Sequence, residues 1–373
     1  MSEWKTVRLG DVCEILNGYA FKSDKYVDSG IRVIRITNVQ KGFIEDNSPA
    51  FYPITEKETL KDYELHENDL LISLTGNVGR VALLSKEMLP AALNQRVGCI
   101  RIRDKNLLIS YLFTFLNSDK FESDCIYSAR GIAQKNMSTE WLKNYLIPLP
   151  PIEVQIKIAN NLNTCSKIIK KHNKQLNNFD LLIKSRFIEM FGDPLENNKK
   201  WDSKKLENLC EIVRGGSPRP IDKFLGGAIP WIKIGDATIG DDIFLYKTKE
   251  HIIEDGIKKS RLISEGSLIF ANCGVSLGFA RIIKFQGCIH DGWLAFQNID
   301  ASINNIFLLK SINMCTDYFR RTAPDGTQPN LNTTIMKNFV QIIPPIKLQE
   351  EYVSFVQQID KSKFENTTQE IAA

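Results

Sequence analysis

The stretch that decides the fold is NMSTEWLKNYLIPLPPIEVQ at residues 136–155, because the chain repeats it as NLNTTIMKNFVQIIPPIKLQ at residues 330–349. Both versions end on two prolines followed by Ile-x-x-Gln, and they start 194 residues apart. Self-similarity at such a long period indicates a duplicated domain rather than an array of short motifs. The rest of the chain should therefore fall into two related halves.

The duplication extends well beyond this stretch. The offset drifts by a few residues between the matching segments, as expected from small loop insertions. With 373 residues, the chain is long enough for two or three domains. Each copy has about 150 residues, which suffices for a separate core. The matching pairs are Trp4–Ile15 with Trp201–Ile212, 31–39 with 229–237, and 67–79 with 265–278.

Within each copy the hydrophobic pattern is mixed. Residues 31–39, 69–74 and 97–102 predict strands, with Arg35 on the opposite face of the first strand from its apolar neighbours. Residues 110–126 predict a helix capped by Ser110, and 305–318 play that part in the second copy. Each copy is therefore expected to be an α+β globule.

A long helix is predicted after each proline pair, because proline suits the first turn of a helix. In the first copy, apolar residues then recur at spacings of four and three until Gly192, a sustained heptad pattern. His172 and Arg186 fall at seam positions, where we interpret them as register-setting polar residues. The predicted coiled-coil seam is Ile158, Leu162, Cys165, Ile169, Leu176, Phe179, Ile183 and Met190 in the first helix, and Leu348, Tyr352, Phe355 and Ile359 in the second.

The two helices are expected to pair with each other, since an apolar seam needs a partner. The second globule connects the end of one helix to the start of the other, so the pairing should be antiparallel. The predicted fold is two pseudo-twofold-related α+β globular domains separated by two long antiparallel helices forming a coiled coil. The predicted bounds are 1–151 for the first domain, 152–192 for the first helix, 193–345 for the second domain and 346–373 for the second helix.

Composition and motifs disfavour several classes of protein. The sequence contains no apolar run of about 18 residues, and its start lacks the apolar region of a signal peptide, which predicts a cytoplasmic protein. The eight cysteines form no CxxC pair, so we expect reduced thiols and no metal site. The sequence contains no P-loop, GxGxxG or Asn-Pro-Pro-aromatic motif. We therefore expect no catalytic residue and no cofactor site in this chain.

Residues suited to DNA contact gather on predicted loops at corresponding places in the two copies. Arg and Lys match guanine and phosphate, Asn and Gln match adenine, and acidic groups match cytosine. The simpler interpretation is ordinary solvated loops with glycine in their turns. The candidates are Arg35, Asn38, Asn77, Arg80, Asn94, Gln95, Arg96, Arg130, Gln134, Lys135, Asn136, Arg214, Arg219, Lys233, Asp236, Asn272, Arg281, His290, Asp291, Arg320, Arg321, Gln328 and Asn330.

The first long helix is basic, with seven Lys or Arg against three acidic residues. One interpretation is a solvated coiled-coil exterior. The other is a rod lying along DNA that is not read, where neutralised phosphates would add salt-dependent affinity.

The order globule, helix, globule, helix resembles the DNA-specificity subunit of type I restriction-modification systems. So do PLPPIEVQIKIANNL (148–162), SRFIEMFGDP (185–194) and IIPPIKLQEEYVSFV (342–356). The resemblance implies that each globule is a target-recognition domain for one half of a bipartite, asymmetric DNA site. It also implies that the coiled coil sets the spacer and binds two modification subunits, which carry S-adenosylmethionine and methylate adenine. Restriction subunits with motor and nuclease activity join the full complex.

The second helix departs from that family pattern because it is short. It spans about 27 residues and its last third is polar, against about 40 residues for the first helix. We expect the part of the first helix nearest the first globule to lack a full partner. The alternative function is a coiled-coil scaffold or interaction protein without sequence-specific DNA readout. Filter binding with duplex DNA separates the two functions.

Overall fold

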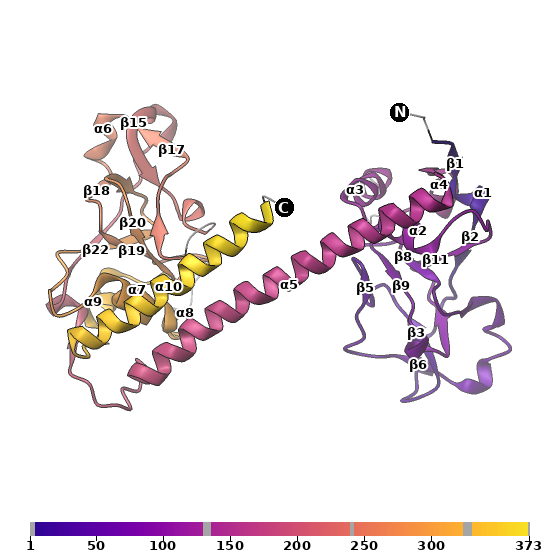
Figure 1. Cartoon of the computed structure of the whole chain (residues 1–373), viewed down its shortest axis with the longest axis horizontal. Helices are drawn as coiled ribbons and strands as arrows, with labels where there is room; N and C mark the ends of the chain where they lie inside the picture. Colours follow the sequence, from indigo (N-terminus) through magenta and orange to yellow (C-terminus); the bar gives the residue numbers. More distant parts are fainter. Residues whose placement is uncertain (1–3, 130–135, 239–241, 324–329, 372–373) are drawn as a thin grey trace. The chain divides into compact units, whose positions relative to one another are not determined.

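The computed structural model describes residues 4–129, 136–238, 242–323 and 330–371, with side chains as far as Lys363 (Figure 1). It divides into two compact units, Met1–His172 and Asn173–Ala373, and the boundary falls inside the long helix α5 (Ile152–Phe191). Each unit combines sheets with helices, which confirms the predicted α+β class. The units are described separately below.

The first unit is built on two sheets, of strand orders β2-β11-β8-β9 and β6-β3-β10-β7, with the ribbons β1–β12 and β4–β5 beside them. Strand β8 lies inside its sheet, which is why all of its residues are buried. The strands are β1 (Thr6–Arg8), β2 (Cys13–Asn17), β3 (Ile31–Ile34), β4 (Val39–Gln40), β5 (Phe43–Ile44), β6 (Phe51–Tyr52), β7 (Glu64–Leu65), β8 (Leu70–Ser73), β9 (Val81–Leu83), β10 (Ala91–Leu93), β11 (Val97–Ile102) and β12 (Leu146–Pro148). The α-helices of its globule are α1 (Leu9–Val12), α2 (Ile109–Leu116), α3 (Asp119–Ser128) and α4 (Thr139–Asn144).

The prediction of one helix over residues 110–126 is wrong in one respect, because the chain forms two helices there. Helix α2 ends at Leu116, and the side chain of Asn117 donates to the Phe113 carbonyl. Helix α3 starts afresh, since the Ser118 hydroxyl accepts a hydrogen bond from the Phe121 amide at 3.3 Å. The second copy likewise divides its segment at Cys315.

The second unit repeats this plan with sheets of strand orders β14-β22-β19-β20-β16 and β17-β15-β21-β18, and the ribbon β13–β23. Its strands are β13 (Ser203–Lys205), β14 (Glu211–Arg214), β15 (Leu225–Ile232), β16 (Phe244–Leu245), β17 (Glu250–Ile252), β18 (Arg261–Ile263), β19 (Leu268–Ala271), β20 (Ala280–Ile283), β21 (Gly287–Ile289), β22 (Trp293–Gln297) and β23 (Val340–Ile342). Its helices, besides the second half of α5, are α6 (Glu254–Ile257), α7 (Asn305–Met314), α8 (Thr316–Thr322), α9 (Thr333–Asn338) and α10 (Ile346–Ile371).

The repeated Pro-Pro-Ile-x-x-Gln motif anchors the start of each long helix to its own domain. The Gln155 side chain is fully buried, accepts from the Leu108 amide at 2.9 Å and donates to the carbonyls of Asn106 and Pro150. Gln349 does the same with the Asn304 amide at 2.8 Å and with the carbonyls of Ser302 and Pro344. The stretch is repeated because the same set of glutamine hydrogen bonds attaches each long helix to its own domain.

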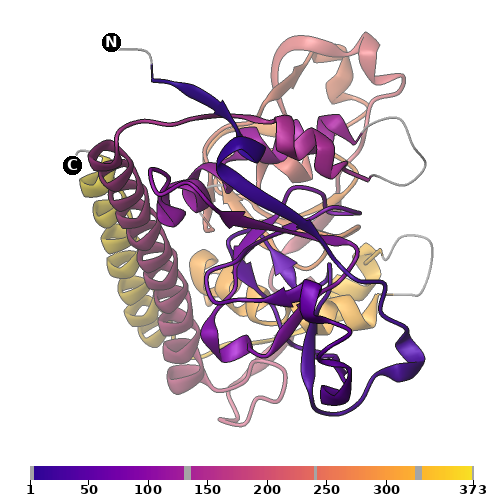
Figure 2. The same ribbon diagram turned by 90° about the vertical axis from the view of Figure 1, so that its right-hand side faces the viewer.

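The second half of α5 pairs with α10 in antiparallel fashion, as predicted (Figure 2). Arg186 forms an ion pair with Glu351, while Asp180, about two turns earlier in α5, bonds to Lys363, which follows Glu351 in α10. Apolar contact supports the pairing, since the rings of Phe187 and Tyr352 meet edge to face with centroids 5.4 Å apart. These contacts lie within the second unit.

The predicted seam divides into three parts. Ile183, Met190 and Tyr352 are buried, and Ile158 packs against the core of the first domain instead of a second helix. Leu176, Phe179, Leu348, Phe355 and Ile359 are half-buried. Leu162, Cys165 and Ile169 are exposed, with 50% and 59% of Leu162 and Ile169 accessible.

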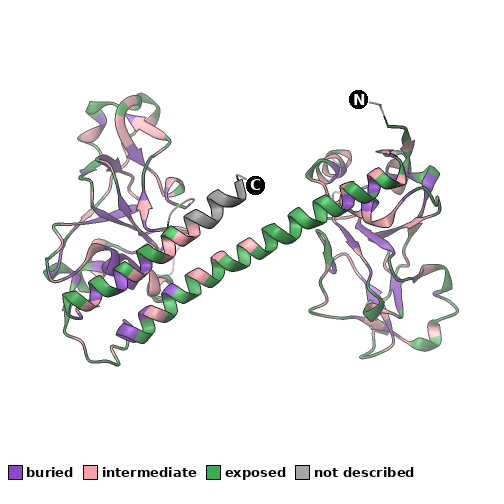
Figure 3. Ribbon diagram, viewed as in Figure 1, coloured by how far each residue is buried: buried purple, intermediate pink, exposed green. Residues whose placement is uncertain are grey.

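The exposed part of the seam belongs to a continuous bare stretch. Every residue from 161 to 171 is exposed, and Figure 3 shows this middle part of α5 in green. The stretch lies on the side of the first globule, as expected from the shorter second helix. Its length is about 16 Å at 1.5 Å per residue.

Helix α5 ends at Phe191, and the next residue, Gly192, has a φ of 78°, which favours glycine over other residues. The Gly192 amide donates to the Ile188 carbonyl at 2.8 Å, and the Trp201 indole donates to the Phe191 carbonyl at 2.9 Å. Neither α5 nor any other helix in the described parts of the chain combines the length and apolar character that crossing a lipid bilayer requires.

Candidate nucleic-acid interface

Three predicted contact loops converge in the second unit. Cys273 and Asn330 form an isolated β-bridge. The Asn272 amide donates to the Gly292 carbonyl at 3.0 Å, and the Leu331 amide donates to the Asn272 carbonyl at 2.8 Å. The segments around Asn272, His290 and Asn330 therefore meet at one place, next to β19 and β22.

The first unit brings its loops together with the same bonds. Thr75 and Asn136 form the matching β-bridge. The Leu74 amide donates to the Arg96 carbonyl at 3.0 Å, and the Met137 amide donates to the Leu74 carbonyl at 2.8 Å. Asn77, Gln95, Arg96 and Asn136 are all exposed there, while Asn94 is half-buried. Sequence reasoning thus found loops that the backbone joins in both copies.

Three candidates instead hold the backbone of these domains. Asn272 is fully buried and donates to Asn330 Oδ1 and the Leu331 carbonyl, both at 3.1 Å. Asn38 Oδ1 accepts from the Arg35 amide at 2.9 Å, and Asp236 Oδ2 accepts from the Lys233 amide at 2.8 Å, which are equivalent turns in the two copies. These turns end β3 early, so the strand predicted over 31–39 stops at Ile34. Asn38 and Asp236 therefore hold turns, and Nδ2 of Asn272 holds the segment at Asn330, so these three residues suit base reading less than the exposed candidates do.

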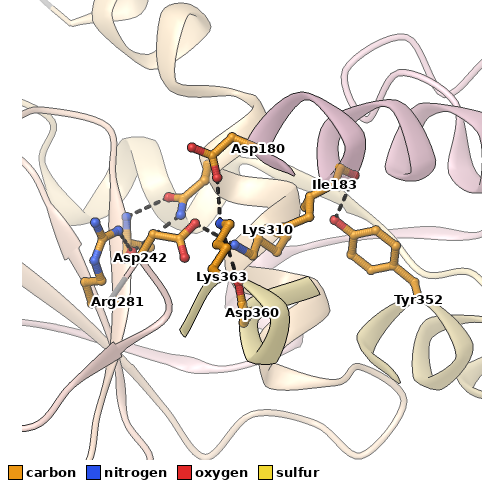
Figure 4. A network of polar contacts seen from close by, with 10 residues as sticks. Asp180, Ile183, Asp242, Arg281, Lys310, Tyr352, Asp360 and Lys363 are labelled. Carbon is orange, nitrogen blue, oxygen red and sulfur yellow. Dashed lines mark hydrogen bonds and ion pairs between the residues drawn. The ribbon is translucent and has the colours of Figure 1, made fainter. Parts of the chain in front are cut away.

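Several candidate cations are also held by internal contacts. Lys233 forms an ion pair with Glu250 and lies 5.3 Å from the centre of the Trp231 ring. Arg35 donates to the Ser48 carbonyl, and Arg80 donates to the Gln40 side chain. Arg281 lies beside Asp242 in a separate cluster (Figure 4), where it contacts the Phe279 ring at 5.0 Å. A bound phosphate would have to compete with these partners.

A compact polar group occupies the converging loops of the second unit. Ser217 donates to Asp291 Oδ1 at 2.8 Å, and Arg214 donates to the Asp291 carbonyl at 3.3 Å. In the neighbouring His290 ring, Nε2 lies 3.0 Å from Asp291 Oδ1. The Nδ1 atom of the same ring accepts a hydrogen bond from the Gly292 amide. Arg214 and Arg219 are exposed, which leaves guanidinium groups available beside a carboxylate.

The His290 imidazole is neutral at neutral pH. Burial lowers the pKa of His290, and Lys233 and Arg219 lower it further, against the opposing effect of Asp291. The neutral form suits its contacts, because Nδ1 must keep a lone pair to accept from Gly292 while Nε2 donates. The group thus offers both donors and acceptors to a ligand.

The remaining candidates lie at the margin of this group or outside the described residues. Arg320 donates to the Leu277 carbonyl at 3.1 Å and so borders the loop after Asn272. Arg321 is exposed but bonds to Asp317 of its own helix. Arg130, Gln134, Lys135 and Gln328 lie outside the described residues.

Sequence reasoning missed three residues at these loops. Ser217 fixes Asp291, and its polar position in a Gly- and Pro-rich loop was an available signal. Val275, at the tip of the loop after Asn272, is 98% exposed, and Tyr127 at the end of α3 is 71% exposed. An apolar side chain in solvent suits contact with a thymine methyl group or a base face.

Two comparisons place the chain among known proteins. The family model of the type I restriction modification DNA specificity domain matches twice, at residues 1–178 and 198–373. The EcoAI specificity subunit of Escherichia coli is 32% identical over 173 residues, which cover 44% of this chain. The chain spans only 29% of that relative. The EcoKI specificity subunit of Escherichia coli K12 is 27% identical, with 95% of this chain and 82% of the relative covered.

A solved structure shares the fold. The S subunit of a type I restriction-modification system from M. genitalium superposes with a TM-score of 0.58, at 14% identity, and the match covers 98% of this chain and 92% of that one. The family model matches twice and leaves only the end of α5 and the turn after it unmatched. This doubled match agrees with the duplicated loops and glutamine anchors described above. The chain therefore belongs to the family of the type I restriction modification DNA specificity domain, which it carries in two copies.

Proposed function

We propose that this chain is the sequence-specific DNA-binding specificity subunit of a type I restriction-modification complex. Each domain would read one half of a bipartite, asymmetric DNA site with its converging loops. The observation that carries the proposal is that equivalent backbone bonds gather these loops in both copies while the side chains differ. Thr75 and Asn77 of the first domain correspond to Cys273 and Val275 of the second. Different side chains on one framework would read different sequences.

The proposed partners follow from the family. Two modification subunits would dock on α5 and α10 and methylate adenine, and restriction subunits would join for cleavage. S-adenosylmethionine would be bound by the modification subunit, so this chain would need no cofactor and would be a non-catalytic component. The methylated base would be flipped into the partner's pocket, leaving this chain to place the complex. Because the proposed substrate is cellular DNA, we place its action in the cytoplasm.

The basic character of α5 has a proposed role at the unread spacer. Lys157, Lys167, Lys170 and Lys171 lie on exposed positions of the helix. Phosphate neutralisation by these groups would add affinity that does not depend on sequence and falls as salt rises.

The test is a domain exchange in the assembled complex. Residues 1–151 are replaced by the first domain of another family member, the chain is co-expressed with its modification subunits, and methylated adenines are sequenced. One half of the methylated site should change while the other half and the spacer remain. Methylation without any bipartite sequence, or a change in both halves, would overturn the proposal.

A further inference from the structure

A cluster of alternating charges lies where the second domain meets both long helices. Asp180 comes from α5, Asp360 and Lys363 from α10, Lys310 from α7, and Asp242 directly precedes Ile243 and β16 (Figure 4). Lys310 Nζ donates to Asp242 Oδ2 at 2.7 Å, and Lys363 Nζ donates to Asp180 Oδ1 at 2.7 Å. Asp360 Oδ1 lies 3.5 Å from the same Lys363 ammonium. The cluster thus joins the domain to both helices.

The Lys310–Asp242 and Lys363–Asp180 ion pairs influence each other, because Asp242 and Lys363 shift each other's pKa values. Burial works against the ionised form of Asp242, yet the pKa of Asp242 is lowered because Lys310, Lys363 and Arg281 stabilise the carboxylate. Burial likewise opposes the charge of Lys363, yet its pKa is raised by the bond to Asp180 and by the carboxylates of Asp242 and Asp360. Lys363 therefore links the Asp180 pair to the Asp242 pair.

Lys310 is the least exposed member of the cluster. Only 7% of its side chain is accessible, and the residues from Ile306 to Ile312 around it in α7 are all buried. An ammonium group in such surroundings needs a fixed counter-charge, because burial removes its hydration. The Asp242 carboxylate supplies that counter-charge.

Beside the charge cluster, close packing alone does not fix the second domain against the two helices. A cavity of about 210 Å³ lies beside the cluster and is lined by Asp180, Asp242, Lys310 and Tyr352, among others. The apolar core that joins the domain to both helices contains Phe187, Phe191 and Tyr352, and the rings of Phe187 and Phe307 stack 5.6 Å apart. The charge cluster lies farther along both helices, where Asp180 of α5 pairs with Lys363 of α10. It therefore holds the domain to the helices at a point beyond that core.

The first copy has neutral residues at the matching positions. With α2 aligned on α7 and α5 on α10, Thr114 matches Lys310 and Ile169 matches Lys363. Thr114 donates to the Ser110 carbonyl of its own helix, and Ile169 is 59% exposed. Among the described residues, the cluster is therefore particular to the second copy and is not a general requirement of the fold.

We propose that Lys310, Asp242, Lys363 and Asp180 are positioning residues that fix the direction of the second domain relative to the two helices, and thereby the DNA spacer that the complex accepts. The inference rests on the proposed function. One base pair of added spacer moves the second half-site by about 3.4 Å and turns it by about 34°. A domain that is held both by the core and by the charge cluster resists that displacement, whereas a domain held by the core alone follows it more readily.

The test uses the complete methyltransferase complex on DNA sites with identical half-sites and spacers from two base pairs shorter to two longer than the native one. The paired substitutions are Asp242→Asn with Lys310→Met, which leaves no buried unpaired charge, and Asp180→Asn with Lys363→Met at the rim. Misplacement by 1 Å can reduce a rate by about a hundredfold. We expect the preference for the native spacer over its neighbours to fall about tenfold, with both half-site sequences unchanged.

A purely structural role gives a different result. Loss of stability would lower methylation at all spacers together and leave the ratio between them unchanged. That outcome in a folded variant overturns the inference. If the Asp242–Lys310 variant does not assemble, the Asp180–Lys363 variant tests the inference by the same ratio of methylation between native and neighbouring spacers. The matched control is Lys205→Met with Glu207→Gln, an exposed ion pair on the same domain, which should keep the wild-type spacer profile.

The experiment also separates the inference from the proposed function. A wild-type complex that methylates no bipartite site refutes the proposed function. A wild-type complex that does so, with variants that keep its spacer profile, refutes only the positioning role.

Discussion

At the scale of single residues, the most informative side chains are the two buried glutamines. Each satisfies one backbone amide and two backbone carbonyls at the point where a long helix leaves its domain. Gln155 and Gln349 were visible in the sequence as part of the repeated motif, but their role was not, because the Asn106–Leu108 and Ser302–Asn304 loops that they hold are remote in sequence. The repetition of a glutamine after two prolines was the signal in the sequence that could have indicated an anchor.

We predict that Gln349→Met destabilises the protein by about 3 kcal/mol. The substitution leaves the Asn304 amide and the Ser302 carbonyl without partners in a buried site, and each unsatisfied group costs about 1–3 kcal/mol. Urea unfolding monitored by circular dichroism measures the change. Gln357→Met, on the exposed face of the same helix, is the control and should change the free energy of unfolding by less than about 0.5 kcal/mol. Equal effects of the two substitutions would refute the anchor.

His290 should make stability depend on pH. Its pKa is lowered in the folded protein, so below about pH 6.5 the unfolded chain binds the proton more readily than the folded one. The free energy of unfolding should therefore fall as pH drops below about 6.5, because a protonated Nδ1 can no longer accept from Gly292. Urea unfolding at pH 7.5 and 5.5, with His290→Gln as the reference, measures this. The idea fails if the reference loses as much stability as the wild type.

At the scale of elements, helix α5 combines three environments along one heptad pattern. Its start is anchored to the first domain, its middle is exposed, and its end is buried in the core that contains Phe187 and Phe191. The sequence predicted the helix and its stop at Gly192 well, because both depend on local signals. It could not show which apolar positions have partners, since that depends on the reach of α10. The break between α2 and α3 was missed because Ser118 caps a helix inside a continuous apolar pattern.

We expect two apolar truncations in α5 to have very different costs. Phe187→Ala should destabilise the protein by about 4 kcal/mol, because the ring is fully buried against Phe191, Phe307 and Tyr352. Ile169→Ala should cost less than about 0.5 kcal/mol, since Ile169 is 59% exposed. Thermal unfolding of the isolated chain distinguishes the two. A large loss with Ile169→Ala would mean that the bare stretch is covered in solution.

At the scale of the whole molecule, the sequence predicted which loops converge better than it showed which side chains are exposed on them. The convergence of loops in both copies follows from the duplication, which the sequence displays. The sequence could not show that Asn38 and Asn272 bond to the backbone, because an amide that reads a base and an amide that holds a turn look alike in sequence. Val275 was missed because composition gives no sign that an apolar residue is exposed.

Inserting one heptad into the bare stretch should lengthen the spacer of the DNA site by about three base pairs. Seven residues add about 10 Å to the helix, and a base pair rises by about 3.4 Å. The insertion at residues 161–171 should not lower the melting temperature, because every residue there is exposed. Sequencing of methylated adenines gives the new spacer. An insertion that is methylated at the old spacing would contradict the idea that the helix acts as a ruler.

The bare stretch of α5 also makes the chain vulnerable to proteases. Lys167, Lys170 and Lys171 lie on a segment whose residues are all exposed, and short helical segments without tertiary support open at little free-energy cost. Brief trypsin digestion should cut there before any buried part of α5, and mass spectrometry should find two large fragments. Each fragment would keep a whole reading domain together with the glutamine that anchors its helix, so the severed halves should stay folded and could be recombined with halves from other family members.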